Sequence, residues 1–141
     1  MDIVQFSFRI FTALACGLAI GLERQLSHKN AGIRTNGLVS LGAAIFVLLS
    51  FEIIEGHGGD ITRIIGQVVT GVGFLCAGVI FHQGVNVQGL TTAATVWCSA
   101  GIGCMAAAGF FAESALCAIT VILVNSLLRF ADVWIDKRNQ E

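Results

Sequence analysis

The sequence predicts an all-α membrane protein, a polytopic bundle of about five transmembrane helices. Of its 141 residues, 55% are hydrophobic and only 12% are charged, and none is proline. Residues 64–112 contain no Asp, Glu, Lys or Arg. Five cysteines lie inside apolar runs without a CxxC pair, which favours buried reduced thiols over disulfides or a metal site. This composition excludes a disordered chain and is unlike that of a cytosolic globular domain.

The spacing of the charges predicts where the helices lie. A bilayer core needs about 20 apolar residues per helix, so the uncharged stretch holds two spans joined by a polar loop at 82–89. The first apolar run is flanked by Asp2 and by Glu23 and Arg24, which favours a retained helix over a cleaved signal peptide. A short turn at 112–114 makes the last two helices antiparallel neighbours. The five expected spans are 3–22, 37–54, 64–81, 93–111 and 114–131, within one transmembrane domain at 1–134 and ahead of a short cytoplasmic tail at 135–141.

The distribution of Lys and Arg predicts the orientation. Basic residues concentrate after the first and fifth spans, and few lie on the other side. Because cytoplasmic loops carry the excess of Lys and Arg, we expect the amino terminus in the periplasm and the carboxyl terminus in the cytoplasm. The basic residues on the expected inner side are Arg24, Lys29, Arg34, Arg129, Lys137 and Arg138, against Arg9 and Arg63 on the outer side.

Small residues predict where the helices pack, since close approach in a bilayer depends on them. Two explanations stay open for the third span: a tightly packed bundle, or local unwinding that exposes backbone carbonyls. An offset of 57 relates Gly21 to Gly78 and Gly32 to Gly89, which indicates either a parallel repeat of two helical hairpins or chance. The expected packing residues are Ala13, Gly17, Gly21, Gly71, Gly73, Gly78 and Gly103.

Three motifs in order resemble the signatures of the MgtC/SapB family of bacterial inner-membrane proteins. They are the runs GLER and AGIRT at 21–24 and 31–35, the run from Asp60 through Arg63 and Gln67 to Ile80, and GLTTAAT at 89–95. Asn36 and Cys76 depart from the family pattern, which tends to have His and Gly there. The soluble carboxyl-terminal domain of many members has no counterpart, so we expect none of its functions here.

The resemblance implies a non-enzymatic protein that modulates other membrane proteins during adaptation to low magnesium or stress. We also expect no cofactor, and self-association through the glycine faces of the helices. The net charge of −1 provides no basic field for a nucleic-acid partner. The sequence agrees in lacking HExxH, GxSxG and P-loop motifs. The alternative is a small transporter or channel for Mg²⁺ or another cation, against which stands the absence of acidic residues in the middle of the expected spans.

Polar residues near the membrane supply the candidate functional site. Asp60 is the best candidate for metal contact, although it could instead cap the third helix. Arg9 either snorkels to the interface or pairs with Glu113, Glu52 or Asp60. We expect Asn125 to hydrogen-bond to another helix. The candidate polar cluster comprises Glu23, Arg24, Arg34, Thr35, Asp60, Arg63, Gln67, Thr91 and Thr92.

Overall fold

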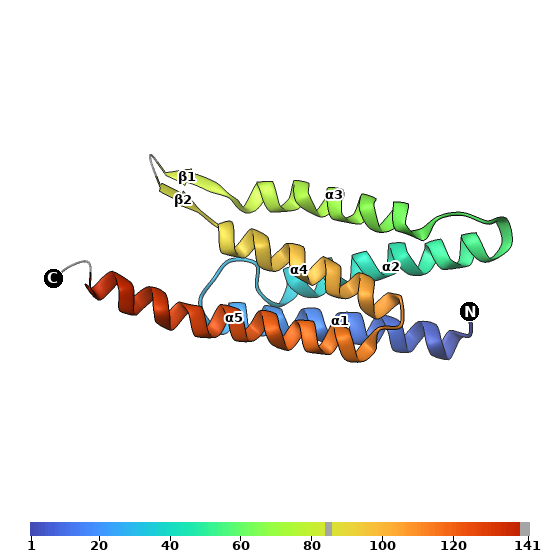
Figure 1. The fold of residues 1–141 in the computed structure, drawn as a ribbon, viewed down its shortest axis with the longest axis horizontal. Helices are drawn as coiled ribbons and strands as arrows, with labels where there is room; N and C mark the ends of the chain where they lie inside the picture. The colour runs from blue at the N-terminus through green and yellow to red at the C-terminus, as the bar shows by residue number, and fades with distance from the viewer. Residues whose placement is uncertain (84–85, 139–141) are drawn as a thin grey trace.

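The computed structural model describes residues 1–83 and 86–138 and contains five helices that run alternately up and down (Figure 1). All five are long and apolar enough to cross a membrane, which confirms the predicted all-α bundle. A short antiparallel hairpin pairs Phe81 with Gln88 between the third and fourth helices. The elements are α1 (Ile3–Leu26), α2 (Ile33–His57), α3 (Ile61–Val79), β1 (Phe81–Gln83), β2 (Asn86–Gln88), α4 (Leu90–Ala107) and α5 (Phe111–Arg138).

Several connections differ from the expected ones. The expected turn at 112–114 is wrong, because α5 already begins at Phe111. The chain turns instead at Gly109, whose φ of +93° is a left-handed conformation that glycine adopts without strain. Glu113 then occupies the first turn of α5, where a carboxylate is stabilised by the positive end of the helix. The predicted polar loop at 82–89 contains the hairpin, and α5 includes the first four residues of the expected tail.

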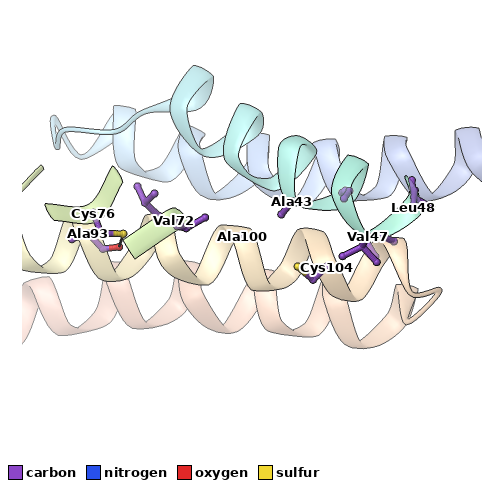
Figure 2. Packing of buried hydrophobic residues seen from close by; sticks show 13 residues of the cluster. Ala43, Val47, Leu48, Val72, Cys76, Ala93, Ala100 and Cys104 are labelled. Carbon is purple, nitrogen blue, oxygen red and sulfur yellow. Dashed lines mark hydrogen bonds between the residues drawn. The ribbon is translucent and has the colours of Figure 1, made fainter. Parts of the chain in front are cut away.

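The bundle has a buried centre and two peripheral helices. In the span of α4, 61% of residues are buried, against 11% in α3 and in the first part of α5. Small and β-branched side chains fill the space between α2 and α4, among them Ala43, Val47 and Ala100 (Figure 2). Val72 and Cys76 of α3 join the same cluster. The helix α3 therefore contacts the bundle along one narrow stripe.

Three glycines let α1, α2 and α4 approach closely. A Cβ atom on Gly17 would lie 2.7 Å from the carbonyl oxygen of Asn36, and one on Gly21 would lie 2.5 Å from the Cα of Ile33. A Cβ atom on Gly103 would lie 2.1 Å from the carbonyl oxygen of Ser40. In each case the obstacle is backbone, which cannot move aside as a flexible side chain can. The helix α2 thus lies directly against both α1 and α4.

Candidate functional site

A cavity of about 630 Å³ opens at the end of the bundle where α1 ends and α4 begins. We call it the Arg24 pocket. The loop after α1 and the hairpin form part of its wall, and α5 closes one side. Its volume is within the roughly 300–1,000 Å³ of small-molecule sites. The lining residues are Glu23, Arg24, Ser27, His28, Lys29, Asn30, Phe81, Val87, Gln88, Gly89, Leu90, Thr91, Thr92, Val124, Asn125 and Leu128.

Two charged side chains of α1 line this pocket without satisfying each other. Arg24 is only 3% exposed and donates a hydrogen bond of 2.7 Å from Nη2 to the hydroxyl oxygen of Thr92. Its buried Nε has no partner among the described residues. Glu23 accepts a 2.9 Å hydrogen bond from Ser27 at Oε1, while its buried Oε2 has no partner in the same part of the chain. A buried polar atom without a hydrogen-bond partner is costly, so these two atoms mark the pocket as more than a packing defect.

The amino-terminal end of α4 forms the facing wall. Gly89 precedes α4 with a φ of +91°, and a Cβ atom there would lie 2.2 Å from the carbonyl oxygen of Val79. Only glycine fits this position, which brings the start of α4 against the end of α3. The N-cap residue of α4 is Gly89, which has no side chain with which to accept from the first amides. These amides add a partial positive charge to the wall.

A chain of buried polar residues continues from the pocket into the bundle. Asn125 of α5 lies 3.3 Å from the hydroxyl of Thr95, which confirms the expected hydrogen bond between helices. Ser99 donates to Oδ1 of Asn36 at 2.8 Å, and Ser40 donates to the carbonyl oxygen of Ala13 at 2.7 Å. These contacts tie α1, α2, α4 and α5 together with groups that are satisfied inside the protein.

Sequence reasoning missed Asn36 and Ser40 as structural residues. Asn36 stood out only as a departure from the family pattern. Its amide donates to the carbonyl oxygens of Ala31 and Gly32, so it also closes the first turn of α2. The available signal was the spacing of Thr91, Thr95 and Ser99, which places hydroxyls on one face of α4.

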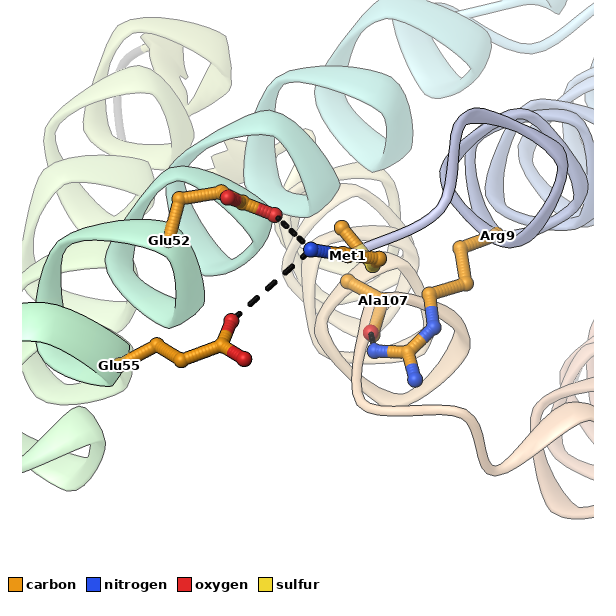
Figure 3. A network of polar contacts seen from close by, with 5 residues as sticks. All are labelled: Met1, Arg9, Glu52, Glu55 and Ala107. Atoms are coloured by element: carbon orange, nitrogen blue, oxygen red, sulfur yellow. Dashed lines mark hydrogen bonds and ion pairs between the residues drawn. The ribbon is translucent and has the colours of Figure 1, made fainter.

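The opposite end of the bundle holds Arg9 (Figure 3). Its Nη1 donates a 2.7 Å hydrogen bond to the carbonyl oxygen of Ala107, the last residue of α4. Its guanidinium carbon lies 5.6 Å from the ring centroid of Phe51. The expected pairing of Arg9 with Glu113, Glu52 or Asp60 is therefore wrong, while snorkelling to the outer interface stays a prediction. The cation instead satisfies a carbonyl at the negative end of a helix, where such charges are favourable.

The expected carboxylate partners of Arg9 make other contacts. Glu52 and Glu55 lie 3.0 and 3.9 Å from the amino group of Met1 (Figure 3). The hydrogen bond and the charge of Glu52 raise the pKa of this amino group above its ordinary value. The contacts join the start of α1 to the end of α2.

Asp60 caps α3. Its Oδ1 accepts hydrogen bonds from the backbone amide of Thr62 at 2.9 Å and from the Thr62 hydroxyl at 2.6 Å. The hydroxyl and amide of Thr62 lower the pKa of the Asp60 carboxyl below its usual range. Among the described residues, no three side chains of His, Cys, Asp or Glu lie close enough together to hold a metal ion. Capping thus accounts for the geometry of Asp60 without a ligand.

The candidate polar cluster divides between separate places. Glu23, Arg24, Thr91 and Thr92 lie together at the Arg24 pocket. The exposed side chains of Arg34 and Thr35 lie on the first turn of α2 outside the pocket lining. Asp60 and Arg63 lie at the other end of the molecule, at the start of α3, and Gln67 lines an apolar groove between α2 and α3.

The candidate packing residues divide in the same way. Ala13 is fully buried, and Gly17, Gly21 and Gly103 make the close contacts described above. Gly71, Gly73 and Gly78 of α3 have open space where a Cβ atom would be. The helix α3 is continuous through all three, so the described backbone is not unwound there.

Comparison with known proteins identifies relatives of this chain. The sequence model of the MgtC family matches residues 10–134. Protein MgtC of Brucella abortus is 49% identical over 117 residues, which are 83% of this chain and 48% of that protein. Protein MgtC of Salmonella typhimurium is 45% identical over 126 residues, 89% of this chain and 53% of that protein.

An uncharacterized protein of Synechocystis is 45% identical over 121 residues, covering 86% of this chain and 51% of its own length. The chain thus spans about half the length of the curated relatives it matches. No solved structure matches significantly. The family match over most of the sequence, together with five membrane-spanning helices, shows that this chain belongs to the MgtC family of multi-pass bacterial membrane proteins.

Proposed function

We propose that this chain is a non-enzymatic modulator that acts by direct contact with other membrane proteins during adaptation to low magnesium. In this proposal the Arg24 end is cytoplasmic and the amino terminus is periplasmic, as the distribution of basic residues favours. The observation that carries the proposal is the outer surface of α3. The name MgtC of the relatives supports the connection with magnesium.

The outer surface of α3 has the properties of a helix-packing face without a helix on it. Gly66, Thr70, Gly73 and Ala77 recur at intervals of three or four residues, so they form one stripe of exposed small residues. A Cβ atom on Gly66 or Gly73 would meet nothing within 4 Å. In a bilayer, small residues at this spacing let a second helix approach closely, and the association is driven by packing and not by water.

A transmembrane helix of another protein is the occupant that we propose for this stripe. Apolar grooves of about 530 and 650 Å³ flank α3, one towards α2 and one towards α4 and α5. They would accept the side chains of a helix seated on α3. A second copy of this chain is the competing occupant.

Transport of Mg²⁺ has less support from the same residues. Magnesium prefers six oxygen ligands in near-octahedral geometry and retains several waters. The best candidate ligand, Asp60, already accepts two hydrogen bonds as a helix cap. The polar chain inside the described bundle is occupied by hydrogen bonds between helices and lacks a carboxylate, which is what a cation path would be expected to contain.

Substitution of the stripe tests the proposal. Gly73→Leu should fail to restore the growth of a null strain under magnesium limitation, because the leucine would block the approach of a partner helix. Protein level and thermal stability should stay unchanged, because the added side chain projects into open space. Gly78→Leu is the matched control, since Gly78 of α3 also has nothing within 4 Å of an added Cβ atom, lies off the stripe and lines neither groove; it should complement fully. Full complementation by Gly73→Leu would contradict the proposal. A loss of oligomer size in that variant would assign the stripe to self-association instead.

A further inference from the structure

We propose that the Arg24 pocket binds the headgroup of a phospholipid that carries both a phosphate and a primary ammonium group. This inference is independent of the role proposed for α3. It follows from the pair of unsatisfied charges in the pocket and from the apolar surface around its mouth.

The cationic half of the site consists of Arg24 and the start of α4. Arg24 is buried, and its guanidinium donates a hydrogen bond to the neutral hydroxyl of Thr92. Among residues 1–55, 58–81 and 87–128, whose side chains the structure describes, no carboxylate forms an ion pair with its guanidinium. The first amides of α4 and the ammonium of Lys29 lie at the same pocket. Arginine and helix amino termini are the groups with which proteins bind phosphate. In the bound state the guanidinium turns its unpaired edge to the phosphate.

The anionic half of the site is Glu23. Its Oε2 is buried and unpartnered in the described structure, one residue along α1 from Arg24. A ligand that carried only negative charge would leave this carboxylate unpaired and repelled. A ligand with an ammonium group beside its phosphate satisfies both side chains, because an ammonium donates charge-assisted hydrogen bonds to a carboxylate.

The walls of the pocket indicate that the ligand has an apolar portion. Phe81, Leu90 and Leu128 line it and are each more than half exposed. Arg24 lies two residues before the end of α1, which places the charged part of the pocket at the membrane interface and these apolar side chains beside the lipid. A phospholipid matches this order, with its headgroup on Glu23 and Arg24 and its acyl chains along α4 and α5.

Native mass spectrometry of lipid binding to the delipidated full chain in detergent tests the proposal. Phosphatidylethanolamine should bind roughly tenfold more tightly than phosphatidylcholine, because the quaternary ammonium of the latter cannot donate hydrogen bonds. Phosphatidylglycerol, which lacks the ammonium group, should also bind more weakly. Equal binding of all three lipids, or tightest binding of phosphatidylglycerol, would overturn the proposal. If soluble phosphoethanolamine displaced bound phosphatidylethanolamine as effectively as the free lipid does, the acyl chains would not contribute to binding, and the assignment of the ligand as a lipid would be overturned.

Single substitutions test separately whether Glu23 binds the ammonium group and Arg24 binds the phosphate. Glu23→Gln should remove the preference for phosphatidylethanolamine over phosphatidylcholine, and Arg24→Gln should weaken binding of both. Arg34→Gln is the matched control, because Arg34 is exposed at the same end and does not line the pocket; it should change neither affinity. If Arg24→Gln does not fold, Glu23→Gln still decides, since its neutral amide preserves the hydrogen bond from Ser27. Unchanged lipid preference in folded Glu23→Gln would contradict the proposal.

Discussion

Replacing Gly103 by alanine should destabilise the bundle far more than the size of one methyl group suggests. The added Cβ atom would lie 2.1 Å from the carbonyl oxygen and 2.8 Å from the carbonyl carbon of Ser40. Both atoms belong to the backbone of α2, so α2 and α4 must separate. That separation loosens the packing of Ala43 and Val47 against α4 and stretches the hydrogen bond from Ser99.

The expected cost follows from these two losses. Overpacking of a well-filled core costs about 1–3 kcal/mol. A hydrogen bond between membrane helices contributes about 0.6–2 kcal/mol. Together they predict a loss of about 2–5 kcal/mol in the free energy of unfolding. Alanine also favours a helix over glycine by about 1 kcal/mol, and a control must remove this gain.

Gly101→Ala supplies that control. Gly101 lies two residues earlier on the same helix, and a Cβ atom there would meet nothing within 4 Å. Unfolding in mixed micelles with increasing denaturing detergent, followed by far-ultraviolet circular dichroism, measures both variants. We expect Gly103→Ala to be about 2–5 kcal/mol less stable than Gly101→Ala. Equal stability of the two variants would refute the close approach of α2 and α4.

Three further outcomes are expected. Arg9→Met keeps the length of the side chain but removes the donor to Ala107, so it should lower the free energy of unfolding by about 2 kcal/mol in the same detergent titration. Asp60→Ala should lower the free energy of unfolding through loss of the cap, while Asp60→Asn should be close to wild type at neutral pH. Because folding lowers the pKa of Asp60, its ionised form stabilises the protein above the unfolded pKa. This stabilisation should disappear as the pH falls through the folded pKa. An acid titration of Asp60→Asn should therefore lack the loss of stability that Asp60 causes in the wild type. A reporter fused after Glu141 that is active only in the periplasm should stay silent; a signal would contradict the proposed orientation.

The five helices could be predicted because the bilayer sets their length. An uncharged stretch at 64–112 can hold only two spans with a loop between them. The ends of the helices were harder to predict. Glu23 and Arg24 suggested the end of the first span, yet α1 continues to Leu26 and buries the arginine. Charge alone does not distinguish a loop arginine from one held inside by a threonine 68 positions later.

The candidate site was predicted in part. Glu23, Arg24, Thr91 and Thr92 meet at one pocket, whereas Arg34 and Thr35 lie outside it. Under the same offset of 57, α2 begins at Ile33 and α4 at Leu90. The predicted spans already placed Arg63 on the opposite side of the membrane from Arg24, so Asp60 could have been separated from the pocket residues by sequence. The role of Arg9 depends on the carbonyl at the end of α4, and the pattern of side chains in a sequence does not show which backbone carbonyls are free to accept.

Magnesium flux into proteoliposomes tests the proposed function most directly. Vesicles that contain the purified full chain and a magnesium-sensitive dye would be compared with protein-free vesicles across an inward Mg²⁺ gradient and an imposed membrane potential. A modulator that acts by contact should give no uptake above that of the protein-free vesicles. Saturable uptake by the wild-type chain that is lost in Asp60→Asn would contradict it and would identify the chain as a transporter.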